Sequence, residues 1–289
     1  MNVRDTLRAA MMHLCLPSVL KRDSMARGLA VDPRHPKDIN EKIQWLMCHK
    51  YGRKYSHYAD KLAVREYVAE CGFGDLLVPV LGSWEKAEDI DFNALPDRFV
   101  LKCNHDSGST ALIDKTAGFD SDALIAFYKR KLSRKFGYVN GEMYYNYIRP
   151  RILAEAFLPP QSGEKSVTDY KFWCFDGKPY AVLVCANRRS DGADLKSYDT
   201  EWTALESACA ATAHYDVLKK DVPRPQHLDR MLVAASKLSE GFPVVRVDFF
   251  ESGGNLYFSE LTLTPYGGKI DYYSREFLLE LGEQCKLTK

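Results

Sequence analysis

Residues 246–267 read RVDFFESGGNLYFSELTLTPYG, and this stretch is the most informative part of the sequence. Two runs of alternating residues flank Gly253-Gly254, a pair typical of a tight turn, so the sequence predicts a β-hairpin here. Successive side chains of a strand point to opposite faces of a sheet, so Arg246 and Asp248 share one face. The first strand therefore presents a cation and an acid side by side.

The second strand of this hairpin brings another acid toward the first. With the turn centred on Gly253, Phe250 pairs with Leu256, and Glu260 then lies diagonal to Asp248 on the same face. Diagonal neighbours are about 7–8 Å apart at the backbone, so two carboxylates can converge on a shared cation. This geometry depends on the register, because a slip of one residue would turn the acids to opposite faces.

Two converging carboxylates suit magnesium, which proteins hold through one or two carboxylates together with substrate phosphates. The alternative is a surface hairpin whose acids are solvated. Aromatic residues on both faces argue against that alternative; they are Phe249, Phe250, Tyr257 and Phe258. The hairpin alone leaves both interpretations open.

The composition is that of an ordinary globular protein. The chain has 289 residues, 46% of them hydrophobic and 27% charged, which is a length typical of two lobes sharing a cleft. A net charge of +1 provides no overall field for nucleic acid or a membrane surface. Eight cysteines without a Cys-x-x-Cys pair indicate free thiols in a cytoplasmic protein. Residues 9–20 lack a clean cleavage site and are interpreted as an amphipathic helix, so membrane contact is at most peripheral.

The pattern along the chain divides it into three parts. Residues 1–74 are predicted to be a helical N-terminal region, with Asp38 and Glu41 forming a capping box at the start of one helix. Short strands and turns follow. They predict an α+β lobe over residues 75–150 and a second one over residues 151–289.

Three further segments have a readable pattern. Asp176-Gly177 predicts the turn of another hairpin. Residues 190–240 are expected to be a loop followed by a helix. Residues 120–148 are expected to be helical and basic, which indicates a solvated helix face or, alternatively, a contact to a phosphorylated substrate.

Two lysines supply charge that could neutralise phosphate. Lys102 ends an apolar strand, and the loop after it, residues 105–110, holds small hydroxyl residues and one glycine whose backbone N–H groups can cradle phosphates. One glycine does not make a P-loop, so this loop does not decide the function by itself. Lys171 lies on an alternating strand, where an exposed lysine is the alternative. His105 is interpreted as a loop histidine with ordinary hydrogen-bond partners.

Other catalytic patterns are missing from the sequence. It contains no Gly-x-Ser-x-Gly elbow, no His-Glu-x-x-His helix and no Walker motif. The chemistries that depend on these motifs are therefore poorly supported.

Taken in order, these pieces resemble the ATP-grasp superfamily. The matching segments are Asp60-Lys61, Val100-Leu101-Lys102 with its loop, residues 153–158, Arg246-Val247-Asp248 and residues 260–267. More narrowly, the chain is similar to the TupA-like branch, which is associated with teichuronopeptide and other surface polysaccharides. That similarity runs from about Asn40 to Phe277. It is carried by NEKIQW (40–45), DKLAVR (60–65), LKCN (101–104), DYKF (169–172) and FDGKP (175–179).

The resemblance implies an ATP-grasp fold, with ATP between two α+β lobes, and an ATP-dependent carboxylate–amine ligase that uses magnesium. It implies nucleotide contacts by Lys61, Lys102, Lys171, Ser107, Gly108 and Ser109, and by a hinge whose backbone would read adenine, Glu155, Ala156, Phe157 and Leu158. It implies catalytic roles for Arg246 and Lys102. It implies magnesium ligation by Asp248, Glu260 and Thr262.

Two departures from the family pattern stand out. Thr262 occupies the position of a metal-binding asparagine, which puts one of two metal positions in question. Only 59 residues precede Asp60, and they are expected to be helical, so the elements that bind the acceptor must differ from those of other family members.

The implied reaction is ADP-forming amide synthesis through an acyl phosphate. The partners would be ATP, a uronic acid on a nucleotide or lipid carrier, and an amino acid or small amine, without nucleic acid. Residues 187–189, Asn-Arg-Arg, could bind an anionic substrate or simply form a polar loop. One rival function is a glycosyltransferase, but Asp89-Ile90-Asp91, which matches the Asp-x-Asp pattern, precedes a loop far in sequence from the lysine strands. The other is a nucleotide-binding module without catalysis, which only Thr262 supports.

Overall fold

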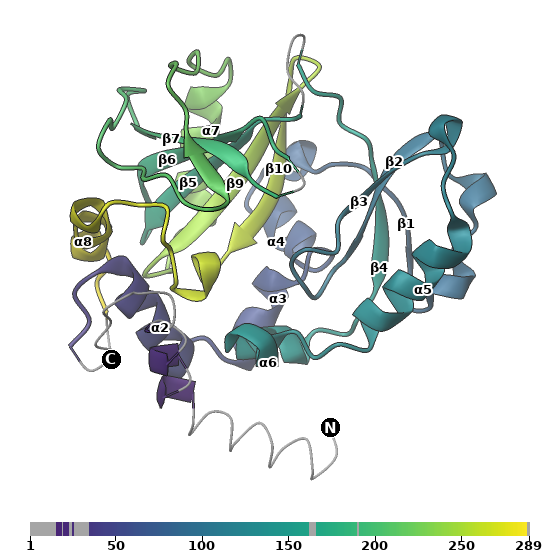
Figure 1. The fold of residues 1–289 in the computed structure, drawn as a ribbon, viewed down its shortest axis with the longest axis horizontal. Helices are drawn as coiled ribbons and strands as arrows, with labels where there is room; N and C mark the ends of the chain where they lie inside the picture. Colours follow the sequence, from purple (N-terminus) through teal and green to yellow (C-terminus); the bar gives the residue numbers. More distant parts are fainter. Residues whose placement is uncertain are drawn as a thin grey trace.

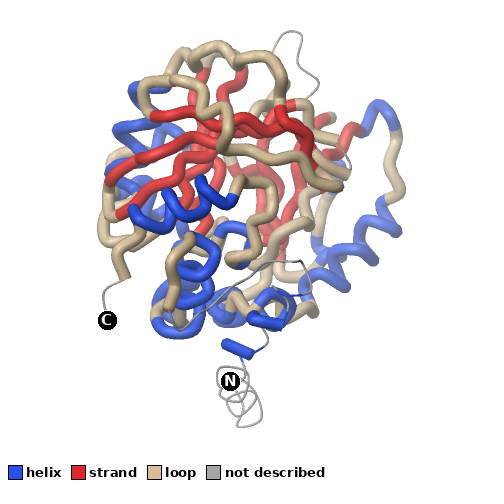
Figure 2. The backbone as a smooth tube through the Cα atoms, turned by 60° about the vertical axis from the view of Figure 1, so that its left-hand side comes forward, coloured by secondary structure: helices blue, strands red, loops and turns tan. Residues whose placement is uncertain are grey.

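Two β-sheets, one in each half of the chain, form the framework of the protein (Figure 1). The smaller sheet has four strands in the order β1-β4-β2-β3, and the larger has six in the order β10-β9-β5-β6-β7-β8. Helices lie around the sheets (Figure 2), so the predicted α+β class is confirmed. The computed structural model describes residues 16–18, 20–22, 25, 35–161, 166–189 and 191–287.

The elements have the following bounds. The smaller sheet consists of β1 (Val80–Trp84), β2 (Arg98–Cys103), β3 (Ala111–Asp114) and β4 (Ile152–Ala156). The larger sheet consists of β5 (Asp169–Phe175), β6 (Lys178–Ala186), β7 (Ala193–Asp199), β8 (Tyr215–Val217), β9 (Val245–Ser252) and β10 (Asn255–Thr262). The α-helices are α2 (Ile39–His49), α3 (Ser56–Ala59), α4 (Val64–Glu70), α5 (Ser121–Leu132), α6 (Gly137–Asn140), α7 (Leu228–Leu238) and α8 (Arg275–Gln284). Short 3-10 helices are η1 (Arg53–Tyr55), η2 (Gly74–Leu76), η3 (Ala87–Asp89), η4 (Phe92–Ala94), η5 (Lys115–Ala117), η6 (Met143–Tyr147) and η7 (Pro265–Gly267).

The N-terminal helices pack onto the larger sheet and share its core. The predicted capping box is present at the start of α2, where the Asp38 carboxylate accepts from the backbone N–H of Glu41 and the Glu41 carboxylate accepts from that of Asp38. The Asn40 side chain both donates to and accepts from the backbone of Ile270, at 2.9 and 2.8 Å. The helical region is thus tied to the end of the chain. α5 instead covers the smaller sheet, which has its own core.

Both predicted hairpins are present. The first turns at Asp176 and Gly177 (φ 47° and 80°) and the second at Gly253 and Gly254 (φ 58° and 76°). Two successive residues with positive φ make a two-residue turn whose twist matches that of the strands. Each turn therefore fixes where pairing begins.

The register predicted for the second hairpin is wrong by one residue near its turn. Because the turn has two residues rather than a centre on Gly253, Phe250 pairs with Tyr257 and not with Leu256. A β-bulge between Phe258 and Glu260 then adds one residue to β10, so Glu260 lies directly opposite Asp248. The bulge makes the two acids closer neighbours than the diagonal arrangement would.

Two other expectations about the second half need correction. β4, which we assigned to the second lobe, is hydrogen-bonded between β1 and β2 and belongs to the smaller sheet. The stretch 190–240 contains β7 and β8 as well as α7, because these strands extend the edge of the larger sheet. β7 pairs antiparallel with β6, and β8 pairs parallel with β7.

Most of the segment 9–20, which we interpreted as an amphipathic helix, lies outside the described residues. Leu16 and Leu20 are described, and both are buried against the main core. Within the described part of the chain, every helix is too short or too polar to pass through a bilayer.

Candidate functional site

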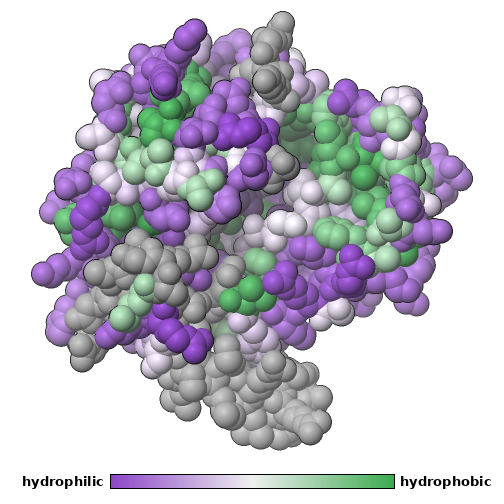
Figure 3. Space-filling view, in the orientation of Figure 1, coloured by the Kyte–Doolittle hydropathy of each residue, from purple (hydrophilic) through white to green (hydrophobic). Residues whose placement is uncertain are grey.

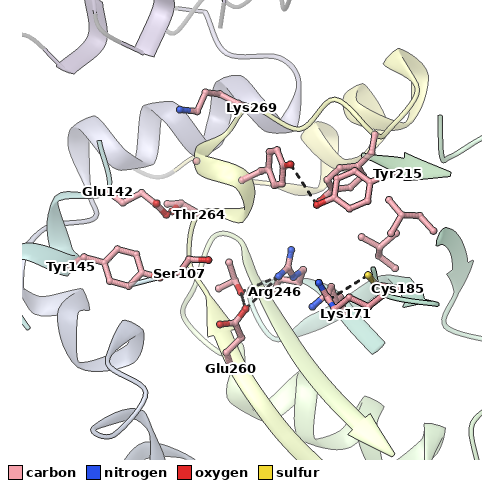
Figure 4. Close-up of a pocket in the computed structure, with 17 residues that line it drawn as sticks. Ser107, Glu142, Tyr145, Lys171, Cys185, Tyr215, Arg246, Glu260, Thr264 and Lys269 are labelled. Carbon is pink, nitrogen blue, oxygen red and sulfur yellow. Dashed lines mark hydrogen bonds and ion pairs between the residues drawn. The ribbon is translucent and has the colours of Figure 1, made fainter. Parts of the chain in front are cut away.

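A cavity of about 420 Å³ lies between the two sheets (Figure 3). Ser107, from the loop after β2, lines it from one side, and strands β5, β9 and β10 form its floor. Figure 4 shows the polar side chains that converge on it. Its lining residues are Ser107, Glu142, Tyr145, Lys171, Leu183, Cys185, Arg188, Leu195, Tyr215, Arg246, Glu260, Thr262, Thr264, Tyr266, Gly267, Lys269 and Tyr272.

The floor is built on a buried carboxylate, that of Asp248. Arg246 donates to both of its oxygens, at 2.7 and 2.8 Å, and Lys171 of the neighbouring strand donates to one of them at 2.8 Å. The register explains these contacts, because Lys171 of β5 pairs with Asp248 of β9. Two cations that line the cavity are therefore held by one acid beneath them.

The charges of this cluster stabilise one another. Burial by itself would raise the pKa of Asp248, but Arg246 and Lys171 outweigh it and hold that pKa below its ordinary value. Burial would lower the pKa of Lys171, yet Asp169 and Asp248 raise it. Arg246 behaves in the same way, with its pKa raised by Asp248 against the effect of burial. All three groups are thus ionised at neutral pH.

Glu260 is the more accessible acid of the hairpin. Its side chain is 38% exposed and lies 3.7 Å from a guanidinium nitrogen of Arg246. The Thr262 hydroxyl donates to the Glu260 carboxylate at 3.1 Å. Together they present a carboxylate and a hydroxyl to the cavity.

The oxygen donors of the hairpin fit magnesium only in part. Glu260 and Thr262 face the cavity and suit an ion that is held mainly by nucleotide phosphates. Both Asp248 oxygens are bonded to cations, so Asp248 could coordinate an ion only after exchanging one of these partners. Among the described residues no group of three or more His, Cys, Asp and Glu side chains converges. Magnesium ligation by the three residues stays a prediction.

Lys61 connects the two sheets electrostatically. It lies between α3 and α4, and its ammonium group donates to the backbone carbonyl of Asp106. The pKa of Lys61 is lowered, mainly by burial; Glu260 of the larger sheet opposes this shift and Lys102 of the smaller sheet reinforces it. Lys61 is therefore close to charged residues of both halves.

Lys102 and the expected hinge meet through a side-chain contact. The Lys102 ammonium lies 2.6 Å from the carboxylate of Glu155, because β2 and β4 are neighbours and both side chains point away from the core beneath α5. Further along the hinge, the guanidinium of Arg98 lies 3.8 Å from the ring centroid of Phe157. The sequence indicated neither contact, since each joins residues that are far apart in the chain.

The loop after Lys102 is held in shape by its own hydrogen bonds. The Ser109 hydroxyl accepts from the backbone N–H of Cys103 at 2.8 Å and donates to the Asp106 carboxylate at 2.5 Å. Gly108 has φ of 79°, which favours glycine. Ser107 is exposed and reaches the cavity. Of the loop's three hydroxyl residues, Ser107, Ser109 and Thr110, Ser107 is the one in the described lining of the cavity.

Other residues predicted for the site lie around the cavity rather than in its lining. Lys171, Arg246, Glu260, Thr262 and Ser107 line it. The predicted residues outside its described lining are Lys61, Lys102, Gly108, Ser109, Asp248, Glu155, Ala156, Phe157 and Leu158.

Two cavity residues come from a segment that we read as a basic helix. Glu142 accepts from the hydroxyls of Thr264 and Tyr144, at 2.5 and 3.0 Å. The bond to Thr264 joins the segment before β4 to the segment after β10. Tyr145 follows it in η6. An acid beside a run of aromatic residues, EMYYNY over 142–147, was the available signal.

His105 differs from its expected role. It is buried, and among the described residues neither ring nitrogen makes a hydrogen bond of ordinary geometry, although backbone groups of Lys131 and Arg134 lie near the ring. Burial lowers its pKa, which favours the neutral ring.

Two other polar segments, Asp89–Asp91 and residues 187–189, were considered for metal or substrate binding, and only Arg188 of them lines the cavity. Asp91 caps η4 by accepting from the backbone N–H of Asn93, and Asp89 ends η3. These acids thus belong to the turns beside the smaller sheet. Of the three polar residues at 187–189, Arg188 lines the cavity, whereas Arg189 binds Asp194 and Asp216.

Comparison with known families and structures gives one family match. The family model described as TupA-like ATPgrasp matches residues 41–286. A comparison with curated proteins gives no match. The family match confirms the ATP-grasp fold expected from the sequence.

Similar solved structures have low identity to the chain. A D-alanine–D-alanine ligase from Bacillus anthracis is 15% identical with a TM-score of 0.43, over 79% of this chain and 67% of that one. The ATP-grasp ligase PsnB, complexed with a minimal precursor, is 15% identical with a TM-score of 0.47, over 99% and 73%. A D-alanine–D-alanine ligase from Helicobacter pylori is 15% identical with a TM-score of 0.39, over 80% and 61%.

Proposed function

The chain belongs to the TupA-like ATP-grasp family and is an ATP-dependent carboxylate–amine ligase, and from this premise we propose that it joins an amino acid or small amine to a uronic-acid sugar in surface-polysaccharide biosynthesis. One observation carries the proposal. Lys171 and Arg246 line the space between the two sheets, while Lys61 binds the loop after β2 and Lys102 lies beside Glu155 on the face of the smaller sheet that α5 leaves uncovered. Such a cluster suits a triphosphate and a carboxylate that must be brought together despite their like charge.

We propose that ATP lies in the cleft between the lobe of the smaller sheet, which includes β4, and the lobe of the larger sheet. Lys102 and Leu112 lie on the same face of the smaller sheet. Val100 is two residues before Lys102 on β2, so it shares that face, and it pairs directly with Leu112 of β3. Leu112 is 56% exposed. An apolar surface beside a lysine suits adenine followed by phosphate. The backbone of Glu155–Leu158 would read the adenine edge, and residues 107–109 would cover the phosphates.

The proposed reaction has two steps. An oxygen of the acceptor carboxylate attacks the γ-phosphorus of ATP, the bond to the β-phosphate oxygen breaks, and ADP leaves. The amine nitrogen then attacks the acyl carbon of the acyl phosphate, the bond from that carbon to the phosphate oxygen breaks, inorganic phosphate leaves, and the nitrogen loses its proton to solvent. No protein nucleophile takes part in either step.

The residues of the site would act by position and charge. Arg246, fixed by Asp248 while it lines the cavity, would stabilise the oxyanion formed during amine attack. Lys61, Lys102 and Lys171 would neutralise the phosphates. Magnesium held by Glu260, Thr262 and Asp248 would supply further positive charge at the β- and γ-phosphates when bound.

The test is product chemistry. The full chain is incubated with ATP, magnesium, glucuronic acid or its nucleotide-linked form, and a panel of amino acids. We expect ADP release that depends on the uronic acid, a hydroxamate when hydroxylamine replaces the amine, and a condensation product by mass spectrometry. Release of nucleoside diphosphate from a sugar nucleotide without ATP consumption would show a glycosyltransferase instead. ATP binding without ADP formation under every condition would leave a nucleotide-binding module.

A further inference from the structure

The cavity changes character along its length. Its phosphate-facing part carries Glu260, Thr262 and Arg246. On the far side of Lys171 from Glu260 lie Cys185 and Tyr215 (Figure 4). The Tyr215 ring contacts those of Tyr266 and Tyr272, and Leu183 and Leu195 pair in register with Lys171 and Cys185; all four also line the cavity. An end of this kind suits the body of a ligand rather than the phosphates of ATP.

Tyr266 is the most exposed aromatic residue of this end. It is 38% exposed and has φ of 55°, a backbone region that non-glycine residues rarely adopt. Its hydroxyl lies 3.5 Å from that of Tyr215, and its ring meets the Tyr272 ring edge-on with centroids 5.6 Å apart. These contacts hold a strained, exposed ring at the cavity wall. Such a ring offers a flat surface for the C–H face of a sugar.

Arg188 brings a cation to the same end. Its guanidinium contacts the carboxylate of Asp169, which is buried, and the sulfur of Cys185 at 3.5 Å, in both cases through one terminal nitrogen. Within the described residues the other two guanidinium nitrogens have no hydrogen-bond partner. The Arg188 side chain is 52% exposed and lines the cavity. One terminal nitrogen of Arg188 is therefore held by Asp169 and Cys185, while the rest of its guanidinium is available to an anion in the cavity.

Asp169 also sets the spacing between two cation positions. It contacts Lys171 at 3.3 Å as well as Arg188, while Lys171 in turn reaches Asp248. Asp169 of β5 pairs with Phe250 of β9, and Lys171 pairs with Asp248, so Asp169 and Asp248 are diagonal neighbours on adjacent strands. Diagonal neighbours are about 7–8 Å apart at the backbone, so the acids that hold Arg188 and Arg246 occupy separate positions.

We propose that this end of the cavity binds a sugar ring that carries a second anionic group besides its reacting carboxylate. The carboxylate lies at Arg246 and Lys171, the ring packs on Tyr266, and the second anion, a phosphate on the anomeric carbon, binds Arg188. This inference rests on the proposed function, which supplies the reacting carboxylate. It adds that the acceptor is a glycosyl phosphate rather than a free uronic acid.

Calorimetric titration of the full chain with three probes tests this inference. Glucuronic acid 1-phosphate carries both anions, glucuronic acid lacks the phosphate, and glucose 1-phosphate lacks the carboxylate. A charge-assisted contact corresponds to about tenfold or more in affinity. We therefore expect the wild-type chain to bind the first probe about tenfold more tightly than either of the others.

Variants assign this preference to residues. Arg188→Gln should bind glucuronic acid as the wild type does but lose the gain from phosphate. Arg189→Gln is the matched control, because Arg189 binds Asp194 and Asp216 instead of lining the cavity, and it should keep the gain. Tyr266→Ala should weaken both glucuronic acid and its 1-phosphate by the same factor, since the ring is common to them. Thermal unfolding of each variant checks that its fold is retained.

Three results would overturn the inference. They are equal affinity of the wild type for glucuronic acid and its 1-phosphate, a phosphate preference that survives in Arg188→Gln, and no binding of the 1-phosphate. Hydroxamate formation is measured separately. A chain that forms glucuronyl hydroxamate without any phosphate preference fails this inference and keeps the proposed function. A chain that shows the preference but never forms ADP fails the proposed function.

Discussion

Replacing Asp248 by asparagine should destabilise the fold as well as stop turnover. Asp248 is fully buried and is the common partner of Arg246 and Lys171, at 2.7 to 2.8 Å. The amide keeps the shape but removes the charge that both cations share, which leaves Lys171 with Asp169 at 3.3 Å and Arg246 with Glu260 at 3.7 Å. Removing one member of a buried ion pair costs about 3–5 kcal/mol. We expect the free energy of unfolding, measured in urea, to fall by that amount with an unchanged m-value.

Asp194→Asn is the matched control for this experiment. The chemical change is the same, but Asp194 pairs with Arg189 near the surface, where such pairs contribute about 0–1 kcal/mol. If both variants lose about the same free energy of unfolding, Asp248 does not hold the cluster together and the reasoning is refuted.

The dependence on pH gives a second readout. The pKa of Asp248 is lowered in the folded chain, with burial opposed and outweighed by Arg246 and Lys171. A carboxyl group with a lowered folded pKa stabilises the fold above its unfolded pKa and loses that effect as pH falls through the folded value. The difference in stability between wild type and Asp248→Asn should therefore be full above about pH 4 and shrink below it.

Two other substitutions test the nucleotide site. Lys102→Ala should weaken ATP binding by about 1.5–3 kcal/mol, or roughly ten- to hundredfold by calorimetry. The control is Lys129→Ala, which removes a surface partner of Glu88 and should leave the affinity for ATP unchanged. Unchanged affinity in Lys102→Ala would make Lys102 only the partner of Glu155. Glu260→Gln should abolish magnesium-dependent ADP formation while changing the free energy of unfolding by less than about 1 kcal/mol, because its contact to Arg246 is long and partly exposed. Near-normal turnover in Glu260→Gln would remove it from the magnesium ligands.

Local patterns predicted the parts of this fold that depend on near neighbours in the chain. The capping box of Asp38 and Glu41 begins α2, and Asp176-Gly177 and Gly253-Gly254 turn the two hairpins. Alternation also placed Arg246 and Asp248 on one face. These features follow from backbone dihedral preferences and side-chain periodicity, which a few consecutive residues determine.

Contacts between distant segments were decided by the tertiary structure. The bulge that sets Glu260 opposite Asp248 has no clear signal in LYFSELT, because it depends on how β10 must bend against β9. The pairing of Lys102 with Glu155 required β4 to enter the smaller sheet, and the approach of Glu142 to Thr264 required the two halves to close on each other. The sequence alone determined which side chains share a strand face. Which faces meet across the cavity depends on how the two sheets pack, because burial of apolar area is non-directional and does not by itself specify partners.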